Sequence, residues 1–248
     1  MNLVFASGFL VPQHFTGIDY FLDLKDHLGG QHHALFPDVP ALGSSEQRAE
    51  RLAEKIAAEF PQGPIHIIAH SMGGLDSRVL IGRNLRGLSV EGRIASLTTL
   101  STPHHGSPVA DLLLSGAGGF TFDLVKTAVE KLGIPAGALE DLTKEGAQKI
   151  PDAAKSHPHI RYRSYFAAGR PGLLPTSILL APTHSFIMHV TNQVNDGLVA
   201  LDSAQYGEFQ QPFWLCDHVD ITGHNLNNLA GKSPFDHLAH IDAIIKQL

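Results

Sequence analysis

The stretch IHIIAHSMGGLDSR, residues 65–78, decides the fold that we expect. Its apolar beginning, from Ile65 to Ala69, is typical of a strand that is buried on both faces of a parallel sheet. Beyond Ser71 the apolar residues recur with the spacing of a helix. We therefore expect Ser71 at a sharp turn from strand to helix, where strained backbone geometry can expose its Oγ atom above the sheet.

Small residues surround this serine, as such a turn requires. Gly73 lets the turn close, and Ala69 stands where the usual G-x-S-x-G pattern has its first glycine. The alternative interpretation is a simple N-cap serine at the start of a helix. The rest of the chain has to decide between these two roles for Ser71.

Length and composition indicate one globular unit. The chain has 248 residues, of which 43% are hydrophobic and 17% charged, so it can bury a substantial core. We predict a single domain over residues 1–248. The formal charge of −6 argues against nucleic acid as the main partner. No apolar run approaches the length of a transmembrane helix, and no protein partner is indicated.

The cellular compartment is left open by the sequence. Cys216 is the only cysteine, so an intramolecular disulfide is impossible. The apolar N-terminal stretch has no Lys or Arg before it, so it is expected to be the first strand and not a signal peptide. The protein would then stay inside the cell, leave it without such a signal, or have lost a leader.

Apolar runs and helical patterns alternate along the chain. This order predicts an α/β fold, with a mostly parallel sheet of about six strands and helices on both faces. A capping box of Ser44 and Gln47 starts one helix, and Ser233 is the expected N-cap of the last one. The expected strands are 3–6, one within 32–39, 65–69, and one in each of 93–106, 159–169 and 211–219. Helices are expected at 20–28, 43–60, after Ser71 and at 233–248.

Two later turns could complete a catalytic site. Asp196 lies in an Asn-Asp-Gly turn, although such a turn needs no function. His218 is expected at the carboxyl end of the strand within 211–219, level with Ser71. Ligands bind parallel sheets beyond the carboxyl ends of the strands, and the order Ser, Asp, His is that of α/β-hydrolases. Asp202 and Asp217 are the rival acids, and His224 is the rival base.

The sequence also resembles a known family. The segments that carry the resemblance are VFASGFL, IHIIAHSMGGLDSR, LTTLSTPHHGSPVADLL, ALEDLTKEGAQKI, RYRSYFA, NQVNDGLV and DHVD. They are similar to the bacterial triacylglycerol lipases of the α/β-hydrolase superfamily, in their small calcium-associated branch. The resemblance implies Ser71 as nucleophile, Asp196 as orienting acid and His218 as base, the three residues that the pattern alone selects.

An oxyanion hole can be placed in the same way. One donor is the backbone N–H of Met72, and the other comes from the loop after the first strand. In the family, that loop reads His-Gly followed by an apolar donor residue, whereas this chain has Ser7, Gly8 and Phe9. Phe9 therefore matches the second donor. The change to Ser7 leaves open how the loop is held.

Calcium is the second departure from the family. Asp220 matches one ligand that the resemblance implies, but no Asp or Glu occurs between Ala153 and Asn195, where the other is expected. Calcium prefers several oxygen ligands, carboxylates foremost. We therefore expect no cofactor for the chemistry and no catalytic metal, with a structural calcium near Asp220 as the remaining option.

Residues 108–142 leave the strand–helix rhythm and are predicted to form a lid inserted in the domain. The apolar side chains expected to face the substrate are Phe120, Phe122, Leu124 and Val125. Flanking glycines could serve as hinges. The alternative is an ordinary helix packed on the sheet. The resemblance favours the lid, because the family places its lid in this region.

The predicted function is a serine carboxylester hydrolase, foremost a triacylglycerol lipase that acts on acyl esters at a lipid–water interface. An esterase for short soluble esters, or another acyl hydrolase, would share the same fold and site. A third alternative, from another class, is a catalytically silent hydrolase fold that binds an acyl ligand. Turnover of esters of increasing chain length distinguishes the three.

Overall fold

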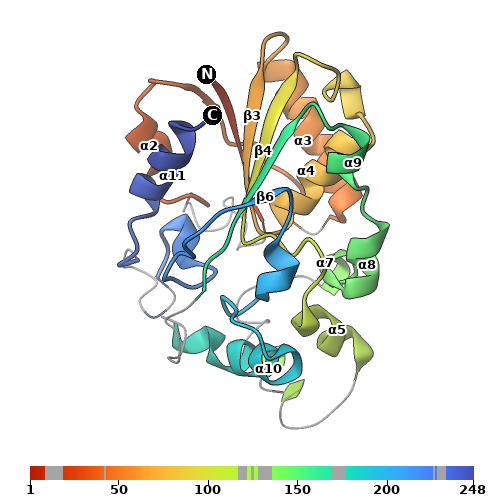
Figure 1. The fold of residues 1–248 in the computed structure, drawn as a ribbon, viewed down its shortest axis with the longest axis vertical. Helices are drawn as coiled ribbons and strands as arrows, with labels where there is room; N and C mark the ends of the chain where they lie inside the picture. Colours follow the sequence, from red (N-terminus) through yellow and green to blue (C-terminus); the bar gives the residue numbers. More distant parts are fainter. Residues whose placement is uncertain are drawn as a thin grey trace.

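The computed structural model describes residues 1–8, 19–41, 43–116, 122–123, 126–127, 136–168, 177–225, 227 and 233–248. Its centre is a six-stranded parallel sheet with the strand order β2-β1-β3-β4-β5-β6 (Figure 1). The strands are β1 (Asn2–Ala6), β2 (His33–Leu35), β3 (Ile65–His70), β4 (Ile94–Leu100), β5 (Arg161–Tyr165) and β6 (Glu208–Phe209). The predicted α/β class is thereby confirmed.

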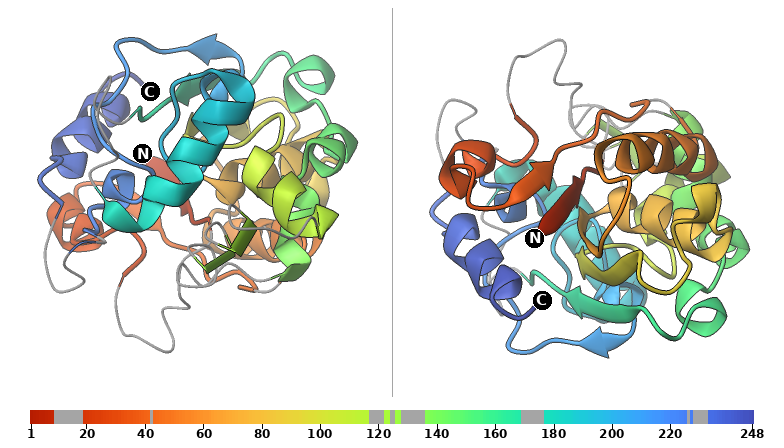
Figure 2. Two further views of the ribbon diagram at one scale, coloured as in Figure 1. Left: turned by 90° about the horizontal axis from the view of Figure 1, so that it is seen from below. Right: turned by 90° about the horizontal axis from the view of Figure 1, so that it is seen from above.

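Helices cover both faces of the sheet. On one side lie α2 (Leu24–Leu28) and α11 (His237–Ile245), and on the other α3 (Ser45–Glu59), α4 (Met72–Gly82) and α9 (Ala153–Ser156) (Figure 1). The lower end holds α5 (Pro108–Ser115), α7 (Ala136–Leu142), α8 (Lys144–Lys149) and α10 (Ala181–Thr191). Short 3-10 turns are η1 (Leu85–Gly87), η2 (Ile178–Leu180), η3 (Leu201–Ala204) and η4 (Asp220–Thr222). Seen from below, α10 crosses the end of the sheet (Figure 2).

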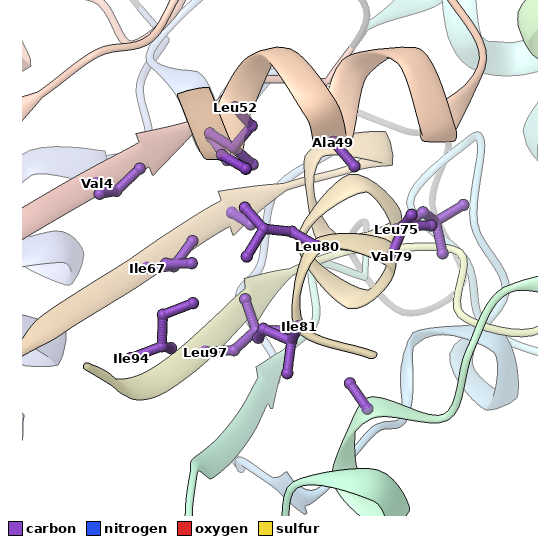
Figure 3. Packing of buried hydrophobic residues seen from close by; sticks show 14 of the residues in the cluster. Val4, Ala49, Leu52, Ile67, Leu75, Val79, Leu80, Ile81, Ile94 and Leu97 are labelled. Carbon is purple, nitrogen blue, oxygen red and sulfur yellow. The ribbon is translucent and has the colours of Figure 1, made fainter. Parts of the chain in front are cut away.

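The central strand β3 is mostly apolar, because both faces of the sheet are covered. Ile65 and Ile67 belong to the core beneath α3 and α4, whereas Ile68 points into the core beneath α2 and α11. Figure 3 shows the first of these cores, where Leu52 and Leu80 pack over the sheet near Ile67. Alternating side chains point to opposite faces, so a strand between two helical layers has almost no position for a polar residue.

The helix after β2 forms as the sequence predicts. The Ser44 side chain accepts a hydrogen bond from the Gln47 N–H, and the Gln47 side chain accepts one from the Ser44 N–H. This capping box satisfies two N–H groups that the first helical turn leaves without partners. Leu52 and Ile56 are buried on the face toward the sheet.

The sixth strand is not where the sequence placed it. The segment 211–219 contributes only an isolated bridge from Trp214 to Ala167, and β6 pairs with β5 a few residues earlier, at Glu208–Phe209. Pro212 has no N–H to give to a strand ladder, which disfavours regular pairing there. His218 therefore lies in a turn beyond this bridge and not at the end of a strand.

Two helices begin later than expected. The last helix has Asp236 as its N-cap, because the Asp236 side chain accepts from the Ala239 N–H, and Ser233 lies outside it. The Ser233 hydroxyl instead donates to Asp220. The helix expected over 20–28 begins at Leu24. An N-cap needs a side-chain acceptor at the right place in three dimensions, and Asp236 supplies it.

The predicted lid is only partly described. Within 108–142, α5 and α7 are helical, and Phe122 is half-buried in a helical turn. Phe120, Leu124 and Val125 lie outside the described residues, so the lid stays a prediction, as does the division of the chain into one domain with this insertion. Among the described residues, no helix is both long enough and apolar enough to span a membrane.

Candidate active site

Ser71 lies at the sharp turn between β3 and α4. Its backbone has φ 55° and ψ −130°, a conformation that residues with a side chain rarely adopt. The Ser71 N–H donates to the carbonyl of Leu100 at the end of the neighbouring strand, 3.0 Å away, which helps to hold the strained turn. Ser71 is therefore the turn serine that its sequence context predicts. It is not an ordinary cap, since its side chain makes no capping hydrogen bond.

Glycines are required around the turn by close packing. A Cβ atom on Gly73 would lie 2.5 Å from the carbonyl oxygen of Ala6, so only glycine lets α4 approach β1 this closely. A Cβ atom on Gly74 would collide with Thr102. Gly8 lies against the turn itself, because a Cβ there would lie 2.6 Å from the Ser71 Cβ atom.

The acidic side chain is held by its own turn. Asp196 is fully buried, and its Oδ1 atom accepts hydrogen bonds from the backbone N–H groups of Leu198 and Val199, at 3.0 and 2.7 Å. Gly197 has φ 98°, and a Cβ atom there would press on Leu180. The turn thus orients the carboxylate and directs the other oxygen, Oδ2, toward His218.

His218 joins the acid to the serine. Its Nδ1 atom lies 2.7 Å from the Oδ2 atom of Asp196, and its Nε2 atom lies 2.9 Å from the Oγ atom of Ser71. An ionised carboxylate only accepts hydrogen bonds, so Nδ1 carries the proton and Nε2 faces the serine hydroxyl as an acceptor. The backbone also contributes, because the His218 N–H donates to the Asp196 carbonyl, 3.0 Å away.

The structure brings together the three predicted residues and gives the rivals other partners. The Asp202 side chain accepts from the Gln193 amide, 2.6 Å away. Asp217 accepts from the backbone N–H groups that follow it in its turn. His224 bonds the carbonyl of Asp19, 2.9 Å away. None of these bonds leads to the Ser71 hydroxyl.

A second histidine beside His218 was missed at the level of the sequence. The ring centroid of His70 lies 4.6 Å from that of His218, and the Tyr20 hydroxyl lies 2.7 Å from the His70 Nδ1 atom. Burial, with His218 nearby, holds the pKa of His70 well below its usual range, so His70 stays neutral beside the catalytic ring. The place of His70 next to Ser71 could have indicated it, but no local signal points to Tyr20.

An apolar cleft opens from Ser71 and His218. It encloses about 480 Å³, counting the open space at its mouth. The remaining walls are mostly apolar side chains from the turn after β4, from α5, from α7 and from the turn after Asp196: Pro103, Ser107, Val109, Ala110, Leu139, Leu142, Leu198 and Val199. Such a surface suits an acyl chain better than a charged or sugar-like group.

Of the two predicted oxyanion donors, Met72 is among the described residues and Phe9 is not. Met72 is the first residue of α4, so its backbone N–H belongs to the first turn of the helix that begins beside Ser71. Such N–H groups have no carbonyl partner within their own helix. Phe9 lies outside the described residues, although Gly8, which precedes it, packs against Ser71. The role of both donors stays a prediction.

Asp220, the calcium ligand that the resemblance implies, accepts hydrogen bonds from two neighbours in the protein. Its Oδ2 atom accepts from the Asp217 N–H at 2.9 Å, and its Oδ1 atom accepts from the Ser233 hydroxyl at 2.6 Å. Across the part of the chain that the structure describes, no group of three or more His, Cys, Asp or Glu side chains could hold a metal ion. Asp220 is thereby joined to the turn that carries His218, and the absence of calcium stays a prediction.

The sheet, the strained serine turn and the hydrogen-bonded series from Ser71 through His218 to Asp196 define a class of protein. A parallel sheet with a serine at such a turn and the order Ser, Asp, His is the arrangement of α/β-hydrolases with a serine nucleophile. The same arrangement occurs with many substrates, so the class alone does not name one.

Lipases and an esterase are among the known proteins that are similar to this chain. The chain is 29% identical over 212 residues to triacylglycerol lipase 2 of Saccharomyces cerevisiae, covering 82% of this chain but 62% of the yeast protein. It is 27% identical to a triacylglycerol lipase of Vibrio cholerae, covering 92% of this chain and 80% of that protein. A metagenomic carboxyl esterase of known structure superimposes with a TM-score of 0.76 at 18% identity, covering all of this chain and 75% of that one. No protein-family model matches.

These similarities confirm the resemblance to the triacylglycerol lipases. They also confirm the α/β-hydrolase fold. The names of the relatives support a lipase or esterase function.

Proposed function

We propose that this protein is a serine carboxylester hydrolase that acts as a triacylglycerol lipase through an acyl-enzyme on Ser71. The observation that carries the proposal is the series of hydrogen bonds from Asp196 through His218 to the Ser71 hydroxyl, at the end of an apolar cleft. Two relatives that are named triacylglycerol lipases support the choice of an acylglycerol as substrate.

The geometry supports a two-step reaction. His218 takes the proton of the Ser71 hydroxyl while Oγ attacks the ester carbonyl, and Asp196 stabilises the imidazolium that forms. The tetrahedral intermediate collapses, and the alcohol leaves with the proton from His218. A water molecule then attacks the acyl-enzyme through the same steps, and the fatty acid is released. Backbone N–H groups, of which Met72 supplies one, would stabilise the negative oxygen in both steps.

An esterase for short soluble esters is the alternative within the same chemistry, and a similar fold occurs in a protein described as a carboxyl esterase. A silent hydrolase fold that only binds an acyl ligand is the alternative outside it. The hydrogen bond between the Nε2 atom of His218 and the Ser71 hydroxyl argues against the silent fold. A protein that only binds an acyl ligand does not need a nitrogen that accepts the proton of a serine.

The test is turnover of p-nitrophenyl esters of increasing chain length, with and without an emulsion, by the wild type and by Ser71→Ala. A lipase should hydrolyse long-chain emulsified esters with a rate that depends on Ser71. Turnover of short soluble esters alone would favour the esterase, and no turnover at any chain length would favour the binding protein.

We also propose that the reaction does not need calcium. The oxygens of Asp220 already accept hydrogen bonds from Asp217 and Ser233, which leaves this carboxylate engaged within the protein. The matching upstream stretch, between Ala153 and Asn195, has no carboxylate to add to it. The role of Asp220 is then to stabilise the turn that carries His218.

A further inference from the structure

A second histidine lies beside the catalytic base, and the reaction steps proposed above do not use it. His70 ends β3 directly before Ser71, and it is only 1% exposed. Its ring centroid lies 4.6 Å from that of His218, with the two ring planes inclined at 44°. A charged ring in this place would oppose the imidazolium that forms on His218. The fold must therefore control both the charge and the orientation of His70.

The partner of His70 is Tyr20, a residue that is 8% exposed. The Tyr20 hydroxyl oxygen lies 2.7 Å from the His70 Nδ1 atom. Gly8 leaves room for this hydroxyl, because a Cβ atom there would lie 2.8 Å from it. Burial raises the pKa of Tyr20, and a hydrogen bond with the Gly8 backbone lowers it in part. A bond that favours the ionised oxygen comes from an N–H, so the phenol oxygen keeps its own proton and accepts another.

These contacts determine where the proton of the His70 ring lies. Among the described residues, the His70 Nδ1 atom is the acceptor at hydrogen-bond distance from the Tyr20 hydroxyl. A proton on Nδ1 would leave this buried hydroxyl without an acceptor, which is costly. Tyr20 therefore donates to Nδ1, and the ring proton is on Nε2. The Nε2 atom is buried and has no hydrogen bond of ordinary geometry, but the His218 backbone favours a proton on this ring.

The two neighbouring histidines consequently have opposite tautomers. The Asp196 carboxylate accepts from Nδ1 of His218, which leaves the Nε2 lone pair of that ring for the Ser71 hydroxyl. The Tyr20 hydroxyl donates to Nδ1 of His70 and so occupies the lone pair that would make His70 a competing base. A neutral His70 ring, in turn, does not repel the imidazolium on His218.

The backbone next to Tyr20 is joined to the turn that follows the base. The Leu22 N–H donates to the carbonyl of Thr222, 2.9 Å away, at the end of η4. The Leu22 carbonyl lies 2.8 Å from the Nε2 atom of His237, at the start of α11. The segment that carries the phenol and the turn that follows His218 thus support each other, and His70 contacts a side chain from each.

We propose that Tyr20 fixes the tautomer and the orientation of His70, and that His70, held in this way, is a positioning residue for the His218 ring. The inference rests on the function proposed above. Asp196 and Ser71 engage the two nitrogen atoms of His218, whereas His70 packs against its ring. Without the phenol hydroxyl, His70 is free to turn and His218 loses this support.

The first comparison is Tyr20→Phe against Tyr162→Phe. Tyr162 is 6% exposed, and its hydroxyl donates to the carbonyls of Ala153 and His157, at 2.9 and 3.1 Å, away from the cleft. A general base contributes about 10²- to 10⁴-fold, and loosening it should lose part of this. We expect Tyr20→Phe to lower kcat on a soluble ester about tenfold, with KM changed less than about threefold. Tyr162→Phe should lose similar thermal stability and keep its kcat.

The second comparison is His70→Asn, alone and combined with Tyr20→Phe. The side-chain oxygen of asparagine can accept from Tyr20 in place of Nδ1, but asparagine has no ring to pack on His218. We expect His70→Asn to lower kcat about 30-fold, again with little change in KM. The double variant should have the kcat of His70→Asn, because Tyr20 acts through His70. Two independent roles would instead multiply the losses.

The tautomer can be measured directly by NMR on protein with ¹⁵N-labelled histidine. The His70 signals are those that disappear in His70→Asn. We expect a bare Nδ1 and a protonated Nε2 in the wild type, without titration between about pH 5 and 8. In Tyr20→Phe the single tautomer should give way to a mixture. A purely structural role of Tyr20 would lower the melting temperature and leave this signature in place.

Three results would overturn the inference. One is a folded Tyr20→Phe enzyme with the kcat of the wild type. Another is a double variant whose loss of kcat is the product of the two single losses. The third is a proton on Nδ1 of His70 in the wild type, which decides the matter even if the variants fail to fold.

The proposed function is tested separately by Ser71→Ala. Loss of turnover in Ser71→Ala, together with full turnover in Tyr20→Phe, would overturn the role of the Tyr20–His70 pair and leave the serine mechanism intact. Turnover that survives in Ser71→Ala would instead refute the mechanism itself.

Discussion

Two polar clusters lie along α4, one at its start and one around Arg78 within the helix. The catalytic cluster consists of Ser71, Asp196 and His218, joined in series by hydrogen bonds. The Arg78 cluster consists of Arg78, His104 and Tyr206, in which the guanidinium lies 4.7 Å from the tyrosine ring centre and the histidine stacks on that ring. In each cluster two of the three side chains are buried, Asp196 and His218 in the first and Arg78 and His104 in the second, and both clusters are hydrogen-bonded. Burial and bonding alone therefore do not distinguish catalysis from structure.

The two clusters differ in whether their side chains line the apolar cleft. Ser71 and His218 line the apolar cleft, and none of the three side chains of the Arg78 cluster does. Arg78 instead donates to the carbonyl groups of His104, at 3.0 Å, and of Ile150, at 3.3 Å. We infer that the first cluster acts on substrate and the second ties α4 to the loops around it. The following predictions test this division, from the largest expected effect on activity to the smallest.

Ser71→Ala should have the largest effect. Without the Oγ atom no acyl-enzyme forms, so we expect kcat to fall by roughly 10⁴-fold or more while the thermal midpoint stays close to that of the wild type. Kinetics on a p-nitrophenyl ester and a thermal melt measure the two. Labelling of another residue by a serine-directed phosphonate, read by mass spectrometry, would contradict the assignment.

His218→Ala should be nearly as severe, because the serine then has no base. His224→Ala is the matched control, since His224 bonds only backbone carbonyls among the contacts described above. We expect ester hydrolysis to be abolished in the first variant and mostly retained in the second. The opposite pattern would show that the base has been misplaced.

Asp196→Asn should have the next largest effect on activity. The amide cannot hold His218 in the right tautomer and cannot stabilise its charged form, and we expect a loss of roughly 10³-fold or more in kcat. Asp202→Asn, at the exposed rival acid, should change kcat less than about twofold. An effect of Asp202→Asn equal to that of Asp196→Asn would argue against the orienting role of Asp196.

Arg78→Met should lower the stability of the protein and leave its activity nearly unchanged. It leaves the carbonyl groups of His104 and Ile150 without their donor, and each buried polar group without a partner costs about 1–3 kcal/mol. We expect the free energy of unfolding, measured in urea, to fall by about 2–4 kcal/mol. kcat should change less than about threefold. A loss of kcat at full stability would place this cluster in the catalytic machinery.

EDTA should have the smallest effect. We expect the rate on soluble esters and the thermal midpoint to stay unchanged after chelation and dialysis, because the Asp220 oxygens already accept from protein donors. Activity that is lost in EDTA and restored by calcium, but not by magnesium, would show a site that these contacts do not reveal.

Short-range patterns explain most of what could be predicted. The turn at Ser71, the capping box of Ser44 and Gln47, and the Asn-Asp-Gly turn at Asp196 each depend on residues within a few positions of one another. Hydrophobic periodicity also distinguishes strands buried on both faces from amphipathic helices. The order of the strands within the sheet was not predicted and is seen only in the structure.

The predictions that were wrong concern features that have no local signal in the sequence. The apolar segment 211–219 has the composition of a strand, but it forms only one bridge, because the edge of the sheet was already taken by Glu208 and Phe209. The last helix begins at His237 and not beside Ser233, whose hydroxyl is engaged with Asp220. Competition between neighbours in space decided both outcomes.

By itself, the sequence determined the class of fold, the serine turn and the three residues that form the predicted triad. These features arise from periodicity, turn chemistry and the order of a few residues along the chain. Only the tertiary structure showed the Tyr20–His70 pair, 50 residues apart, and the link from Arg48 to Asp76, 28 residues apart. The physical reason is that a buried polar group must find a partner wherever the fold brings one, and sequence distance places no limit on that partner.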